Sequence, residues 1–231
     1  MIVHREFAQQ SVEWMLARAG IPTASEFGAL VSPTGEVRVG KGVETYLAQK
    51  LAEKWRGGPI TEFSSFDMDQ GSILEKEALP AFRLLYEVNV ETVGFIHSND
   101  RLLGCSPDGW IETEKRGIEI KCPADHNHVK YLLADKLPPD YIAQVQGSMH
   151  VAECESWYFM SHCRGLPPLI LLIQRDEEYQ EALAQALDEF HQMMDIGWEK
   201  LIHKNGGPPA RSNYVHTPKP AAEKFVSELP T

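Results

Sequence analysis

The sequence predicts an α/β fold in which a central mixed β-sheet is flanked by helices. Helical patterns fill the N-terminal part, short strand-like segments follow between residues 92 and 122, and helices and strands then share the remainder. The 231 residues, 43% of them hydrophobic, can bury one sizeable core without a second domain. We therefore expect a single domain over residues 1–205 and a proline-rich arm over residues 206–231.

The N-terminal part is predicted to be helical. Thr23 is a favourable N-cap, and Glu26 three residues later completes a capping box. Pro80 is predicted to kink the last of these helices. The helices are expected over residues 11–19, from residue 23, over residues 43–55 and over residues 68–88.

The strands of the sheet are predicted from short apolar or alternating segments. Four of them are expected to form an antiparallel meander, over residues 92–97, 101–105, 110–113 and 117–122. The elements expected after the meander are helices over residues 125–135 and 139–152, strands over 156–161 and 169–174, and a long amphipathic helix over 176–204.

Composition limits the possible functions. The net charge of −11 argues against a protein that coats DNA with its whole surface, but it permits an enzyme whose cations line the substrate path. The longest apolar run, residues 169–173, is too short to span a membrane, and the N-terminus lacks the apolar region of a signal peptide. The four cysteines form no C-x-x-C pair and are interpreted as buried free thiols, so we expect a cytoplasmic protein.

Two carboxylates and a lysine form the candidate catalytic group. A turn after residue 111 predicts a hairpin that sets Asp108 beside Glu119, and strand alternation places Glu119 and Lys121 on one face. Two carboxylates can hold Mg²⁺, while a lysine can orient or help deprotonate water and stabilise charge on the transition state. The pattern alone leaves an alternative open, in which Asp108 is a turn residue and the other two form a solvated strand face.

Four stretches in order resemble the phage lambda exonuclease or YqaJ-type viral recombinase nucleases of the PD-(D/E)xK superfamily. The resemblance covers about residues 14–190. Its motifs are the Trp-x-x-x-Arg-x-Gly-x-x-Thr-Ala-Ser-Glu of residues 14–26, the Gly-x-x-x-Glu of 71–75, the Pro-Asp of 107–108 with the Glu-x-Lys-Cys-Pro of 119–123, and the Tyr-x-x-Gln-x-Gln of 141–146.

The resemblance implies roles for individual residues. Asp108, Glu119 and the carbonyl oxygen of Ile120 would bind the metal, with Lys121 as the catalytic cation. The cofactor would be Mg²⁺, two ions per active site, with Mn²⁺ able to replace it. Further roles fall on Glu75 as a third acid, on Gln144 beside the site, on Arg18 and Ser25 as ligands of a 5′-phosphate, and on Met68 as a wedge between the DNA strands.

Some positions near these motifs are interpreted differently. Gln146 is expected to point away from the site, about 200° round the helix from Gln144. Asn127 stands where lambda exonuclease has an arginine thought to touch DNA, so His126, His128 or Lys130 are the candidates to replace that contact. Residues 175–177, Arg-Asp-Glu, are interpreted as helix capping and surface charge.

The function implied by the resemblance is that of a 5′-to-3′ exonuclease acting on double-stranded DNA ends. It would release mononucleotides, leave a 3′ single strand, and act in a bacterial host as a phage or prophage product. Members of the family form a ring-shaped homotrimer and work with a phage single-strand annealing protein. The alternatives are an endonuclease of the same superfamily and a catalytically inactive scaffold that binds DNA ends.

Overall fold

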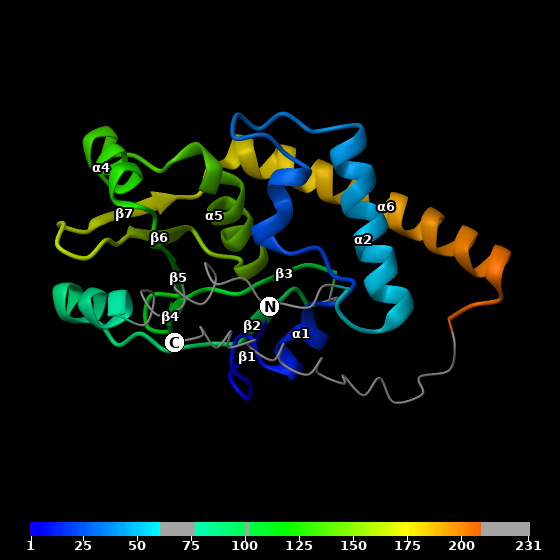
Figure 1. Cartoon of the computed structure of the whole chain (residues 1–231), viewed down its shortest axis with the longest axis horizontal. Coiled ribbons are helices and arrows are strands. Elements are labelled where there is room, and N and C mark those ends of the chain that lie inside the picture. Colours follow the sequence, from blue (N-terminus) through cyan, green and yellow to red (C-terminus); the bar gives the residue numbers. More distant parts are fainter. Residues whose placement is uncertain (61–76, 100–101, 209–231) are drawn as a thin grey trace, which may run out of the picture.

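The computed structural model describes residues 1–60, 77–99 and 102–208, and its described strands form two sheets flanked by helices (Figure 1). The predicted α/β class is therefore confirmed. One sheet joins β1 (Ile2–His4), β2 (Phe95–His97) and β3 (Gly104–Cys105), all antiparallel. The other has the order β4 (Gly109–Ile111), β5 (Arg116–Lys121), β6 (Ser156–Ser161) and β7 (Leu169–Gln174), with β5 and β6 parallel.

The predicted single meander is wrong, because the chain changes sheet between β3 and β4. Pro107 has no backbone N–H to donate to a neighbouring strand. The N–H of Asp108 turns instead to the carbonyl of Ile118, at 2.9 Å. Trp110 exchanges two backbone hydrogen bonds with Glu91, both 2.8 Å, so the outer edge of β4 is paired outside the first sheet.

Most predicted helices are confirmed to within two residues at each end. The helix predicted from Thr23 is instead a 3₁₀-helix, η1, and its capping box does not form. The hydroxyl of Thr23 donates to the carboxylate of Glu26 at 3.1 Å instead of accepting from a backbone amide. The bounds are α1 Val12–Arg18, η1 Ala24–Ala29, α2 Lys41–Arg56, α4 Asp125–Ala134, α5 Pro139–Ala152 and α6 Glu177–Asn205, with residues 77–86 also helical.

Both faces of the four-stranded sheet are covered. Ile118 and Ile120 of β5 pack with Phe82 of the helix over residues 77–86. The opposite face carries Trp157 and Phe159, which belong to the core cluster shared with α5. Strand alternation turns Glu119 towards this second face, so its carboxylate lies beneath α5 and not in open solvent.

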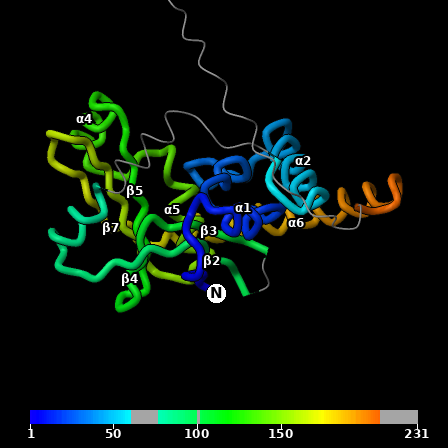
Figure 2. The backbone as a smooth tube through the Cα atoms, turned by 60° about the horizontal axis from the view of Figure 1, so that its bottom comes forward, coloured from blue at the N-terminus to red at the C-terminus, as the bar shows by residue number. Residues whose placement is uncertain are grey.

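Helices α2 and α6 pack side by side, as both views of the chain show (Figures 1 and 2). The rings of Tyr46 and Phe190 stack with their centroids 5.0 Å apart, and Trp55 meets Trp198 edge-on at 5.8 Å. Among the described residues no helix is long and apolar enough to cross a membrane. Cys105, Cys154 and Cys163 are buried free thiols, as predicted, whereas Cys122 is only partly buried.

The close packing of β5 against β6 can be tested by a substitution at Gly117. A Cβ added to Gly117 would overlap the indole ring of Trp157, which is fully buried. We expect Gly117→Ala to destabilise the protein by about 1–3 kcal/mol and to lower the Tm by about 3–10 °C.

The control for this substitution is Gly42→Ala in α2, where an added Cβ meets nothing within 4 Å. Because alanine favours helix more than glycine does, its Tm should equal or exceed the wild-type Tm. Thermal unfolding followed by circular dichroism measures both. An unchanged Tm for Gly117→Ala would contradict the close contact between β5 and β6.

Candidate active site

Asp108 and Glu119 meet where β4 pairs with β5. Gly109 lies opposite Ile118 in the antiparallel register, so Asp108 stands beside the middle of β5. Its Oδ2 accepts the backbone N–H of Ile120 at 2.6 Å, which fixes the carboxylate against the strand. The hairpin inferred from the sequence thus brings the two carboxylates to one edge of the sheet.

Glu119 is a buried carboxylate with two compensating partners. Its exposed fraction is only 2%. The ammonium of Lys121 lies 2.5 Å from Oε1, and the side-chain amide of Gln144 from α5 donates to the same oxygen at 2.5 Å. A buried charge is tolerated when it is paired and hydrogen-bonded in this way.

Lys121 lies at the end of β5 with 26% of its side chain exposed. Its ammonium also lies 5.5 Å from the centre of the Tyr141 ring. Burial, assisted by a hydrogen bond with Tyr131, raises the pKa of Tyr141 to about 12, so this phenol stays neutral at physiological pH. Lys121 therefore combines contact with the buried carboxylate and access to a substrate.

The donor set of the site fits a hard divalent cation. Two carboxylates and the carbonyl of Ile120 offer the oxygen ligands that Mg²⁺ prefers. The amide of Gln144 and the shortest approach of Lys121 both fall on Oε1 of Glu119. The described ranges hold no group of three acidic, cysteine or histidine side chains suited to a metal. Glu75, the predicted third acid, and Met68 lie outside the described residues.

Arg18 forms a second group whose partners are neutral. Its guanidinium donates to the hydroxyls of Ser106 at 3.1 Å and of Thr23 and Ser25 at 3.4 Å each, and it stacks 4.3 Å from the centre of the Trp14 ring. Burial lowers the pKa of Arg18. Since no described carboxylate lies within ion-pair distance, this desolvated cation can still take an anion.

Ser106 connects the two groups. Its hydroxyl accepts hydrogen bonds from Arg18 and from the indole N–H of Trp14, the latter at 2.9 Å. Asp108 follows two residues later, so one short segment touches both the guanidinium and the carboxylate pair. The sequence reasoning assigned no role to Ser106 or Trp14. The available signal was their place inside the first and third motifs, with Trp14 and Arg18 one helical turn apart.

Other predicted positions lie elsewhere. Gln146 is buried and bonds to the carbonyl of Gln174 at 3.0 Å and to the side chain of Gln180 at 2.9 Å, which confirms that it points away from the site. His128 is fully buried, with its ring nitrogens bonded to Ser161 at 2.7 Å and to the carbonyl of Pro167 at 3.0 Å. The prediction that His128 could contact DNA is therefore wrong, because this histidine lies in the core with both ring nitrogens hydrogen-bonded.

The remaining candidates on α4, His126 and Lys130, are both exposed. Asp176 caps α6 as predicted, since its carboxylate accepts the N–H of Tyr179 at 3.1 Å. Arg175 pairs with Glu177 at 3.2 Å, but only 20% of its side chain is exposed, so it is not simply a surface charge.

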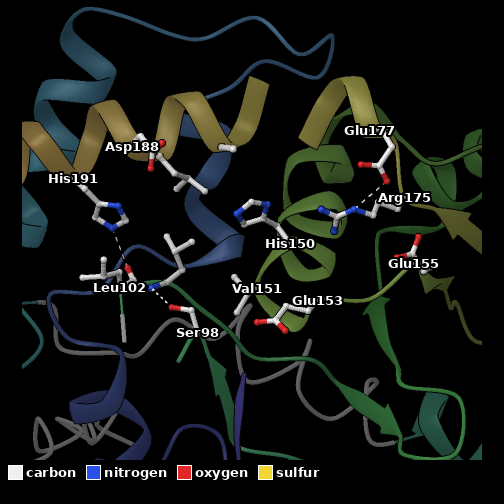
Figure 3. A pocket seen from close by; sticks show the side chains of 13 residues that line it. Ser98, Leu102, His150, Val151, Glu153, Glu155, Arg175, Glu177, Asp188 and His191 are labelled. Atoms are coloured by element: carbon white, nitrogen blue, oxygen red, sulfur yellow. Dashed lines mark hydrogen bonds and ion pairs between the residues drawn. The ribbon is translucent and has the colours of Figure 1, made fainter. Parts of the chain in front are cut away.

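A separate pocket of about 670 Å³ lies near α6, the C-terminal end of α5 and the segment before β3 (Figure 3). It contains none of the predicted site residues. Its charged and polar lining is dominated by acids, which disfavours a phosphate-rich ligand there. These charged groups are Glu153, Glu155, Glu177, Asp188 and Arg175, accompanied by His150 and His191.

The fold and this pair of strands define the class of protein: a nuclease of the PD-(D/E)xK type, with Pro107-Asp108 before one strand and Glu119-x-Lys121 on the next. The model of the YqaJ-like viral recombinase domain matches residues 13–155, more than half of the chain, and the chain belongs to this family. The resemblance inferred from the four motifs is thereby confirmed. A comparison with curated proteins gave no match.

Solved structures agree with this assignment. The alkaline exonuclease from Laribacter hongkongensis is 25% identical with a TM-score of 0.74, and the match covers 85% of this chain and 98% of that one. The same exonuclease in complex with dAMP gives 26% identity and a TM-score of 0.75, with the same coverage. A phage-related exonuclease from Haemophilus somnus 129PT, 13% identical with a TM-score of 0.59 over 78% of this chain and 96% of that one, shares the fold.

Proposed function

We propose that this protein is a Mg²⁺-dependent exonuclease that degrades one strand of duplex DNA from a 5′-phosphorylated end, in the 5′-to-3′ direction. It releases mononucleotides and leaves a 3′ single strand for recombination by strand annealing. The observation that carries the proposal is the segment from Ser106 to Asp108. It connects the guanidinium of Arg18, which has no anionic partner among the described residues, to the carboxylates of Asp108 and Glu119. The dAMP complex of the Laribacter hongkongensis exonuclease supports a mononucleotide product.

Each residue has a chemical task in this proposal. Arg18 and Ser25 hold the terminal phosphate by charge-assisted hydrogen bonds. Asp108, Glu119 and the carbonyl of Ile120 hold Mg²⁺, two ions per site, or Mn²⁺ in its place. When bound, the metal polarises the phosphate and lowers the pKa of water.

The other side chains act around these ligands. Gln144 fixes the orientation of the Glu119 carboxylate through its amide. Lys121 orients or helps deprotonate the attacking water and stabilises negative charge on the phosphate oxygens in the transition state. Glu75 is proposed as a third acid and Met68 as the wedge that separates the strands.

The test is digestion of linear duplex DNA labelled at either end. We expect mononucleotide release from a 5′-phosphorylated end in Mg²⁺, weaker release from a 5′-hydroxyl end, and none with a chelator. Equal loss of label from both ends at the earliest times would contradict the polarity. Linearisation of a circular duplex would favour the endonuclease alternative, and binding without cleavage would favour the inactive scaffold.

The proposal extends to assembly and partners. A ring-shaped homotrimer would hold DNA by topology, which accounts for sustained contact with a polyanion despite a net charge of −11. A phage single-strand annealing protein would then load on the 3′ strand, in the cytoplasm of a bacterial host. A monomer in analytical ultracentrifugation would contradict the ring.

A further inference from the structure

Lys50 of α2 is a buried cation beneath the Arg18 group. Its exposed fraction is 4%. Its ammonium pairs with Oε2 of Glu26 at 2.9 Å and with Oε2 of Glu53 at 3.1 Å. Glu53 in turn accepts the backbone N–H of Gly20 at 2.9 Å. Since a buried lysine is costly unless paired, this arrangement fixes both carboxylates as well as the cation.

Glu26 is separated from Arg18 by a single hydroxyl. The hydroxyl of Thr23 donates to Oε2 of Glu26 at 3.1 Å and accepts from the guanidinium of Arg18 at 3.4 Å. Burial lowers the pKa of Arg18, and the negative charge of Glu26 is the largest influence that raises it. The two groups therefore interact electrostatically. The side chain of Glu26 is 39% exposed, which leaves it room to move.

We propose that Lys50 is a positioning residue that holds Glu26 away from Arg18 and so keeps the guanidinium open to a 5′-phosphate. The inference rests on the proposed role of Arg18 at the DNA end. Without the ammonium, Glu26 loses its cationic partner, and Arg18 is the cation reached through Thr23. An Arg18–Glu26 ion pair would occupy the donors that the phosphate needs.

A merely structural role for Lys50 makes a different prediction. Loss of stability would weaken binding to every DNA end alike. Closure of the phosphate site by Glu26 would weaken binding of a 5′-phosphate end selectively and would be reversed by removing the charge of Glu26. The ratio of the two dissociation constants, for 5′-hydroxyl over 5′-phosphate duplex, therefore separates the two roles.

The experiment measures this ratio by fluorescence anisotropy with full-length protein, a chelator and constant salt. Wild type gives the reference value of the ratio, and Arg18→Ala gives its lower limit. We expect Lys50→Met to lower the ratio about tenfold, and the double variant Lys50→Met with Glu26→Gln to return to within about twofold of Glu26→Gln alone. Lys41→Met, an exposed lysine at the start of the same helix, is the control and should match wild type.

The outcomes are distinguishable. If wild type shows no preference for the phosphate, the proposed end recognition fails, and with it the ground of the inference. If wild type shows the preference but Lys50→Met keeps it, or the double variant stays as low as Lys50→Met, the role of Lys50 is overturned. If Lys50→Met does not fold, the Glu26→Gln variant alone tests the proposal. Its ratio of dissociation constants should equal or exceed that of wild type, and a fall of more than about threefold would overturn the proposal.

Discussion

Lys121→Ala is expected to slow phosphodiester cleavage by about 10²- to 10⁴-fold while leaving the binding of duplex ends nearly unchanged. The ammonium lies 2.5 Å from Glu119 and stands partly exposed at the end of β5, where it can reach both water and phosphate. Removing it withdraws a positive charge from the position where negative charge develops in the transition state. The Arg18 group, which is assigned to end binding, keeps all its contacts.

Single-turnover digestion of 5′-phosphorylated duplex in Mg²⁺ measures the chemical step directly. Lys115→Ala provides the control, because this lysine is exposed on the turn between β4 and β5 and pairs only with Glu112 among the described residues. It should cleave at the wild-type rate. If the Lys121→Ala variant cleaved DNA at the wild-type rate, a catalytic role for Lys121 would be excluded. A large loss of end binding in the same variant would instead assign Lys121 to substrate affinity.

The sequence predicted those parts of the fold that are encoded locally. Helix α5 and strands β6 and β7 have the predicted bounds, since their apolar patterns are continuous and Pro139 marks the helix start. Strand β1 was not predicted, because its three residues acquire meaning only by pairing with β2. The 3₁₀ geometry of η1 likewise depends on distant packing, in which Phe27 lies against Gly147 of α5.

In the candidate site, too, the sequence predicted what is encoded locally and missed the contacts between residues distant in the chain. The spacing of Asp108 and Glu119 was enough to predict a hairpin that brings them together, because both lie on strands that are neighbours in the chain. The contact of Arg18 with Ser106 joins residues 88 apart, and no local pattern encodes it. The burial of Lys50 could not be predicted for a related reason. A lysine on a helix surface is ordinarily solvated, and Lys50 is buried because η1 packs on α2.

Glu119→Gln is expected to abolish both cleavage and metal-dependent stabilisation. Glutamine keeps the size of the side chain but removes the charge that a divalent cation needs. Because bound metal supplies several kcal/mol to phosphoryl chemistry, the cleavage rate should fall by at least about 10³-fold. In wild type, Mn²⁺ or Mg²⁺ should raise the Tm with concentration, since a ligand that binds only the folded state stabilises it. That rise should be absent in Glu119→Gln.

The Tm without metal separates a ligand from a structural carboxylate. The partner left behind, Lys121, has 26% of its side chain exposed and can be hydrated, so the substitution should cost no more than about 1 kcal/mol, or about 2–4 °C in Tm. Glu114→Gln, which loses a 2.8 Å ion pair with Arg116 on the nearby turn, is the matched control and should keep the metal response. A Glu119→Gln protein that still gains stability from Mn²⁺ would exclude Glu119 as a required ligand. A collapse of the metal-free Tm would show instead that this buried carboxylate serves the fold.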